Sequence, residues 1–159
     1  MALTTQPPEI VEEYFTQDLK HFDLCLVIIR GIPGSGKTTL AKKIANNLNA
    51  SHFENDTFFA DEQGNYHFDI NYHQQAKDEC LEKTKEALLA GKIVVVSNTF
   101  IKKSEMEPYT KFCDENGDLN YAVIEMELRF ENTHNIPQSI VNQKEAEFEP
   151  LEQSIAVGF

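Results

Sequence analysis

A glycine-rich segment in the first quarter of the chain holds the residues with the clearest chemistry. Residues 31–38 read G-I-P-G-S-G-K-T and match the pattern G-x-x-x-x-G-K-[ST]. Glycines allow successive backbone N–H groups to turn toward one centre, where they bind phosphate oxygens. Lys37 adds a positive charge for the β- and γ-phosphates, and the Thr38 hydroxyl is the expected Mg²⁺ ligand. The segment therefore predicts binding of a nucleoside triphosphate.

The expected nucleotide contacts come from this segment and the residue after it. They are Gly31, Pro33, Gly34, Ser35, Gly36, Lys37, Thr38 and Thr39. A dinucleotide cofactor is the rival ligand for a glycine-rich turn, and its pattern is G-x-G-x-x-G. Thr39 stands where the third glycine would be required, so that pattern fails.

The surrounding residues predict the elements that position this segment. Residues 23–30 are a continuous apolar run, typical of a strand buried on both faces in a parallel sheet. After the glycines, Leu40, Ala41, Ile44, Ala45 and Leu48 form one helical stripe. Further strands are predicted at 52–55, 92–97 and 121–128, and further helices at 9–20, 71–90, 103–116 and 137–148.

This alternation predicts an α/β fold with three layers, a parallel sheet of about four strands flanked by helices, as in P-loop NTPases. In the helix at 71–90, the predicted inward residues are Ala76, Cys80, Thr84, Ala87 and Leu88. We divide the chain into an N-terminal leader and helix at 1–22, a P-loop kinase-like domain at 23–149 and a C-terminal tail at 150–159, expected to be poorly ordered.

Charge and hydropathy narrow the possible partners. The chain has 159 residues, with 14 Lys and Arg against 26 Asp and Glu, for a net charge of −12. A negative field disfavours long polyanions, so extended nucleic acid is a poor fit. No apolar run reaches the roughly 20 residues that cross a bilayer. We expect a cytoplasmic protein without a membrane partner, bacterial or, if encoded by a phage, in the host cytoplasm.

Candidate catalytic residues follow the predicted strands, because ligands in parallel α/β sheets bind outside the strands' carboxyl ends. Asp56, after the second strand, is the candidate general base for an acceptor hydroxyl, with Asp61 as a weaker alternative. Ser97 and Asn98 follow the third strand, where many phosphate-loop enzymes carry a metal-linked aspartate. Either Asp56 serves the Mg²⁺, or Ser97 and Asn98 hold its water molecules.

The chain contains two arginines, Arg30 and Arg129. Arg129 is the candidate for offsetting negative charge at the γ-phosphate during transfer. Arg30 directly precedes the glycine-rich segment and is an equally good candidate for a structural residue.

Several stretches together resemble a known family. Besides the glycine-rich segment, they read F-E-N-D-T-F-F, G-N-Y-H-F-D, V-V-V-S-N-T-F, E-M-E-P-Y and N-T-H-N-I-P. Their order and spacing, across about residues 24–149, resemble small phage and bacterial ATP-binding proteins. These are relatives of the phage polynucleotide 5′-hydroxyl kinase and of the kinase-like domain of Nedd-four-binding-protein-two.

The resemblance implies roles for particular positions. Lys37 and Thr38 match the phosphate and metal positions, and Asp56 matches the first aspartate of a D-D-Y stretch, the general base of the polynucleotide kinases. The arginine that follows this stretch in the phage kinase is Phe59 here, and the family's D-N-T-N becomes S-N-T-F without its aspartate. A lid stretch R-N-x-H-G-V-P becomes E-N-T-H-N-I-P, for whose missing arginine Arg129 is the candidate substitute.

Two functions remain open at this point. The first is an Mg²⁺-dependent kinase that transfers the γ-phosphoryl group of ATP to a hydroxyl of a small molecule or a nucleic-acid end. The second is an ATP-binding switch or slow ATPase without a dedicated acceptor. A scaffold that binds no nucleotide is a third class, which the glycine-rich segment disfavours.

Overall fold

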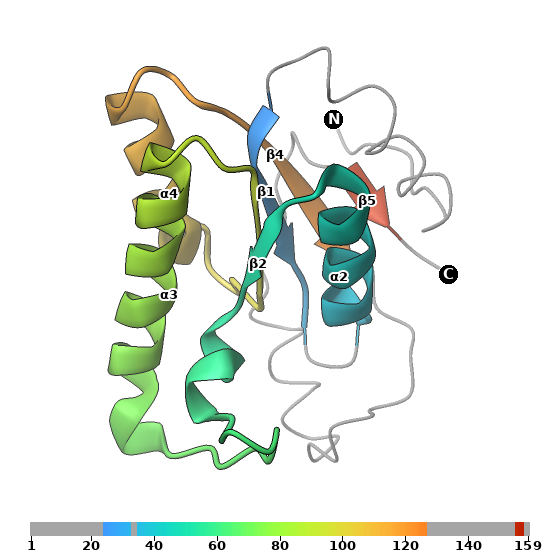
Figure 1. Ribbon diagram of the computed structural model, residues 1–159, viewed down its shortest axis with the longest axis vertical. Coiled ribbons are helices and arrows are strands. Elements are labelled where there is room, and N and C mark those ends of the chain that lie inside the picture. Colours follow the sequence, from blue (N-terminus) through green and yellow to red (C-terminus); the bar gives the residue numbers. More distant parts are fainter. Residues whose placement is uncertain (1–23, 33–34, 127–154, 158–159) are drawn as a thin grey trace.

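The computed structural model describes residues 24–32, 35–126 and 155–157. Its described part is a five-stranded sheet with helices on both sides (Figure 1). The strands are β1 (Leu24–Arg30), β2 (Ser51–Phe53), β3 (Val94–Asn98), β4 (Asn120–Met126) and β5 (Ile155–Val157). The helices are α2 (Lys37–Leu48), α3 (His73–Leu89) and α4 (Lys103–Glu115), with two short 3₁₀ helices, η2 (Asn55–Phe59) and η3 (Ile70–Tyr72).

The strand order is β2-β3-β1-β4-β5, and every neighbouring pair is parallel. The predicted α/β class and the four predicted parallel strands are confirmed. β5 is an addition, and it lies in the stretch that we expected to be a poorly ordered tail. That expectation is wrong for residues 155–157, because their backbone pairs with residues 124–126 of β4. The predicted helices at 9–20 and 137–148 lie outside the described residues.

Two hydrophobic clusters explain why β1 lacks alternation. Val27 and Ile29 pack toward α2, whereas Leu26 and Ile28 belong to the cluster formed with α3 and α4. Successive side chains of a strand point to opposite faces, so a strand covered on both faces must be apolar throughout. All four of these side chains are 0% exposed. None of the described helices is long and apolar enough to cross a bilayer.

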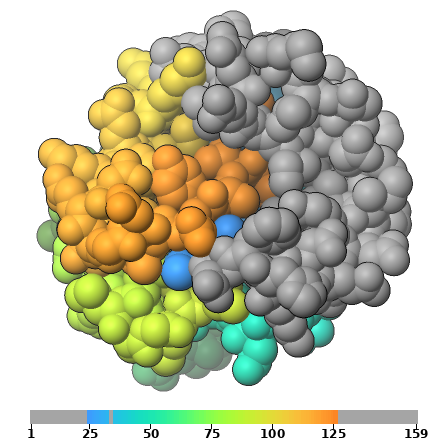
Figure 2. Space-filling view, turned by 90° about the horizontal axis from the view of Figure 1, so that it is seen from above, coloured from blue at the N-terminus to red at the C-terminus, as the bar shows by residue number. Residues whose placement is uncertain are grey.

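Different parts of the chain form the two ends of the sheet. The carboxyl ends of β1, β2 and β3 lie together with the start of α2, at the lower end of the view in Figure 1. The turns that follow α3 and α4 lie at the opposite end. Figure 2 looks onto that opposite end, where the residues around the α4–β4 turn (orange) and the end of α3 (yellow-green) border the start of β1 (blue). Gly117 in the α4–β4 turn has a φ of 90°, a conformation that favours glycine.

β2 ends two residues earlier than predicted. The backbone N–H of Asn55 donates a hydrogen bond to Oδ1 of the Asn98 side chain at 2.7 Å. Since that N–H no longer faces a backbone partner in β3, the chain leaves the sheet and turns into η2. This exit places residues 54–59 beside the carboxyl end of β3.

Candidate nucleotide-binding site

The glycine-rich segment lies between β1 and α2. A Cβ atom on Gly31 would lie 2.6 Å from Oγ of Ser35 and 2.8 Å from Cβ of Met126, so no side chain fits there. Gly36 has a φ of 85° directly before α2. Pro33 and Gly34 lie outside the described residues, and their predicted phosphate contacts stay predictions.

The start of α2 is suited to an anion. No side chain caps the helix, so the N–H groups of its first turn, which include those of Lys37, Thr38 and Thr39, have no side-chain acceptor. These groups and the helix dipole favour negative charge. The Ser35 side chain is fully buried, and its Oγ has no hydrogen-bond partner among the described residues. Buried polar atoms are usually satisfied, so a phosphate oxygen would complete this turn.

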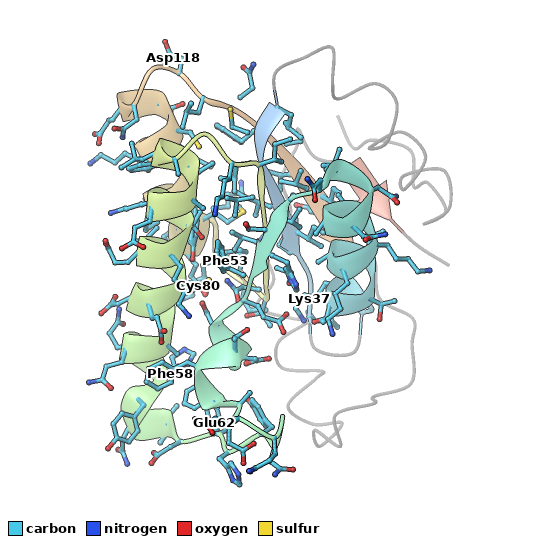
Figure 3. All side chains as sticks on the ribbon, viewed as in Figure 1. Lys37, Phe53, Phe58, Glu62, Cys80 and Asp118 are labelled. Atoms are coloured by element: carbon cyan, nitrogen blue, oxygen red, sulfur yellow. The ribbon has the colours of Figure 1, made fainter. Side chains whose placement is uncertain are left out.

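Lys37 lies at the first turn of α2, facing the end of the sheet where β2 passes into η2 (Figure 3). Its Nζ approaches the carbonyl oxygen of Ile32 at 3.5 Å. Burial lowers the pKa of Lys37, whereas the nearby carboxylates of Asp56 and Glu54 act in the opposite direction. The lysine and the two carboxylates therefore share one electrostatic site.

Glu54 is a site residue that the sequence reasoning missed. Its Oε2 accepts a hydrogen bond from Oγ1 of Thr38 at 3.0 Å and another from Oγ of Ser97 at 3.1 Å. Nε2 of His52 lies 2.7 Å from the same Ser97 Oγ. Glu54 belongs to the F-E-N-D stretch and lies inside the strand predicted at 52–55, whereas the candidate carboxylates were those that follow a predicted strand. Its position two residues before Asp56 is the feature of the sequence that indicates a place in the site.

Asp56 lies in η2 and is exposed. One of its carboxylate oxygens accepts a hydrogen bond from the hydroxyl of Tyr66 at 3.4 Å. Burial, with the negative charge of Asp56 next to it, raises the pKa of Tyr66 to about 12. Tyr66 therefore stays a hydrogen-bond donor to Asp56 at physiological pH.

Asn98 and Arg30 contact other parts of the protein. The Asn98 side chain accepts from the Asn55 N–H, and its Nδ2 lies 3.7 Å from Sγ of Cys80. Arg30 is 0% exposed, forms an ion pair with Glu125 at 2.8 Å, and donates to the carbonyl oxygens of Phe100 and Ile101. Of the two roles open for Arg30, these contacts favour the structural one. Arg129 and the predicted lid stretch lie outside the described residues.

Tyr66, the partner of Asp56, belongs to a group of aromatic rings. The Phe59 ring is buried and lies 6.1 Å from the Tyr66 ring and 5.1 Å from the Phe68 ring, between ring centres. Tyr66 and Phe68 are stacked and about half exposed, at 54% and 52%. Residues 51–76 contain no lysine or arginine. We call Tyr66, Phe68 and Phe59 the aromatic shelf.

Comparison with known proteins identifies the family. The AAA domain family matches residues 26–126, which is more than half of the chain. The chain belongs to the AAA domain family. This AAA domain includes the glycine-rich loop, so nucleotide binding through that loop is the family's property. The human NEDD4-binding protein 2 is 32% identical over 102 residues, which are 62% of this chain and 6% of that protein. The chain thus spans a small fraction of its curated relative.

Solved structures share the fold of this AAA domain. A gluconokinase from Sinorhizobium meliloti superimposes with a TM-score of 0.56 at 18% identity, covering 86% of this chain and 83% of the other. A chain of the Pnkp1/Rnl/Hen1 RNA repair complex gives a TM-score of 0.64 at 17% identity, covering 83% of this chain and 49% of the other. At these identities the likeness establishes a P-loop NTPase fold.

Proposed function

We propose that the protein is a phosphotransferase that moves the γ-phosphoryl group of ATP to a hydroxyl acceptor, with Mg²⁺ as cofactor. The observation that carries the proposal is the shared site of Lys37 and Asp56, one bearing positive charge for phosphates and the other a carboxylate within electrostatic reach. A carboxylate in this place can accept the proton of an acceptor hydroxyl, as a kinase requires, or orient a water molecule, as an ATPase requires. The name of the gluconokinase is in keeping with kinase chemistry on this fold.

The residues have distinct roles in this reaction. The loop N–H groups and Lys37 hold the β- and γ-phosphates, as charge on the transferred group must be offset. Asp56 accepts the proton of the attacking hydroxyl, and Tyr66 orients the Asp56 carboxylate. Arg129 is the proposed cation for the γ-phosphate. Mg²⁺ would supply further charge compensation at the phosphates, and Thr38 is the proposed ligand.

The acceptor that fits this site is a small molecule or a short nucleic-acid end. The aromatic shelf beside Asp56 offers ring faces on which a flat base or the apolar face of a sugar can pack. The stretch 51–76 offers no lysine or arginine for a run of phosphates, and the net charge is −12. An extended polynucleotide would need such contacts.

A second candidate is an ATP-binding switch or slow ATPase. It is favoured by the end of β3, where Ser97 and Asn98 stand instead of a carboxylate and are engaged by protein atoms. It predicts ATP turnover without a phosphorylated acceptor.

One experiment separates the two. The purified protein is incubated with ATP, Mg²⁺ and a panel of nucleosides, sugars and short 5′-hydroxyl oligonucleotides, and products are detected by mass. We expect one acceptor class to gain a phosphoryl group. Asp56→Asn should bind ATP normally but lower the transfer rate by about 10²–10⁴-fold. Glu62→Gln, which changes an exposed carboxylate on the same segment, is the matched control and should retain the rate. Normal transfer by Asp56→Asn would exclude its role as base, and ADP formation with no modified acceptor would favour the switch.

A further inference from the structure

The Glu54 carboxylate joins three elements at the nucleotide site. It follows β2, accepts a hydrogen bond from the Thr38 hydroxyl in the first turn of α2, and accepts another from the Ser97 hydroxyl in β3. Both bonds go to Oε2, at 3.0 and 3.1 Å. No described residue donates to Oε1 of Glu54. One oxygen is therefore fixed by the protein, and the other is available to a ligand.

This arrangement suits the ion that accompanies a nucleotide. A hydroxyl that donates its proton to a carboxylate keeps its oxygen lone pairs for a cation. Mg²⁺ prefers oxygen ligands and retains several water molecules, so it needs few protein groups. The described residues contain no cluster of three or more His, Cys, Asp or Glu that could hold a metal alone. The described residues therefore suit a Mg²⁺ ion that binds together with the nucleotide phosphates, with Thr38 as a direct ligand.

Resting on the nucleotide site of the proposed function, we propose that Glu54 is the metal-linked carboxylate of this protein, acting through Thr38 and through water at Oε1. Glu54, directly after β2, supplies the negative charge that an aspartate at the position of Ser97 in β3 would supply. Asp56 is exposed in η2 and contacts Tyr66, while Thr38 donates to Glu54. Asn98 is engaged by the Asn55 N–H and lies against Cys80. This division leaves Asp56 for the acceptor hydroxyl.

His52 and Ser97 hold this carboxylate in place. Because the Ser97 hydroxyl donates to Glu54, its oxygen is left to accept a proton from Nε2 of His52 at 2.7 Å. In the tautomer that carries its proton on Nε2, the His52 ring donates to this oxygen, and the same Nε2 lies 3.8 Å from Oε2 of Glu54. The His52–Ser97–Glu54 chain then directs its hydrogen bonds toward the carboxylate. Such outer partners fix the orientation of groups around a metal.

The test measures binding rather than activity. The affinity for a non-hydrolysable ATP analogue is determined by calorimetry with Mg²⁺ and with EDTA, for the parent chain and for Glu54→Gln. The ratio of the two affinities reports the metal contribution. We expect the Glu54→Gln ratio to be lower than the parent's by about 10–100-fold, the usual effect of losing an outer-shell partner of a metal. The EDTA affinity should be equal or higher, because a negative charge near the phosphates is removed.

Two further variants make the result specific. Glu62→Gln removes the same charge from the exposed turn, away from Lys37 (Figure 3), and should keep the parent ratio. Glu54→Ser with Ser97→Asp moves the carboxylate to β3. If a carboxylate beside Thr38 is what matters, the affinity ratio of this double variant should lie between those of Glu54→Gln and the parent. Thermal melting verifies that each variant is folded.

The outcomes distinguish this inference from the proposed function. If the parent chain binds no nucleotide in either condition, the proposed function fails and this inference with it. If the parent binds and Glu54→Gln keeps the parent ratio, only the role of Glu54 is overturned. A folded double variant with the same low ratio as Glu54→Gln would also count against it.

Discussion

Arg30 provides the perturbation whose size follows most directly from the structure. Its guanidinium is 0% exposed and pairs with Glu125, whose side chain is 12% exposed, at 2.8 Å. It also donates to the Phe100 carbonyl from Nε at 3.0 Å and from Nη2 at 2.6 Å, and to the Ile101 carbonyl at 3.1 Å. Arg30 therefore joins the ends of β1 and β4 to the segment that follows β3.

Replacing Arg30 with Met leaves a partly buried carboxylate and two carbonyl groups without these donors. Breaking a buried ion pair by removing one partner costs about 3–5 kcal/mol. For a chain of this size, 1 kcal/mol lowers Tm by about 2–4 °C. We expect Arg30→Met to lower the free energy of unfolding by about 3–5 kcal/mol and Tm by about 6–20 °C. Urea and thermal unfolding, followed by circular dichroism, measure both quantities.

Two controls test the cause of this loss. The double variant Arg30→Met with Glu125→Leu removes both charges and should be more stable than Arg30→Met alone, because the carboxylate that loses the guanidinium is also gone. Lys111→Met breaks an exposed pair with Glu115, 3.9 Å apart, and should stay within about 0.5 kcal/mol of the parent. An Arg30→Met chain within about 1 kcal/mol of the parent would refute the structural role that we assign to Arg30.

Three further outcomes are expected. Gly31→Ala should lower both Tm and nucleotide affinity, measured by melting and calorimetry, because its Cβ would lie 2.6 Å from Ser35 Oγ. Burial lowers the pKa of Lys37, so the native chain releases this proton at lower pH than the unfolded chain. Between those two pKa values, rising pH should therefore increase the free energy of unfolding while nucleotide affinity falls, and titrations over a pH series should reveal neither trend in Lys37→Met. Ile44→Ala, at a fully buried position of α2, should cost about 2–5 kcal/mol in urea unfolding, whereas a loss below about 1 kcal/mol would contradict its place in the core.

Local periodicity was sufficient to predict the helices that flank the site. The five inward positions predicted for α2 and the five predicted for α3 are the buried residues of those helices. These predictions succeed because the spacing of the apolar residues along a helix determines which face is apolar. The glycine-rich motif is equally local, since the phosphate contacts that it predicts depend on a run of eight residues.

Contacts between distant residues were the part that sequence could not supply. β5 is three residues long, and its pairing with β4 joins residues 155–157 to 124–126 through the backbone. Nothing in the three side chains indicates that partner. Glu54 is a similar case, because its role depends on Thr38 and on Ser97, which lies 43 positions away along the chain. A carboxylate inside a predicted strand gives no sign of which neighbouring strand it will face.

The sheet register explains why a glutamate at position 54 and a serine at position 97 suit each other. β2 pairs with β3 up to Phe53 and Val96, so Glu54 follows beside Ser97. Neighbouring strands lie about 4.8 Å apart, and a side chain from β2 must cross that spacing to reach Thr38 on α2. Glutamate has one more methylene than aspartate for this reach, and serine is small enough to leave the path open while donating a hydrogen bond on the way. An aspartate at position 97 would put a second carboxylate in the same place, and two such groups cannot both be ionised there without repulsion. The absent carboxylate at position 97 and the Glu54 carboxylate after β2 are therefore two parts of one arrangement, which keeps one carboxylate in hydrogen-bond contact with the Thr38 hydroxyl.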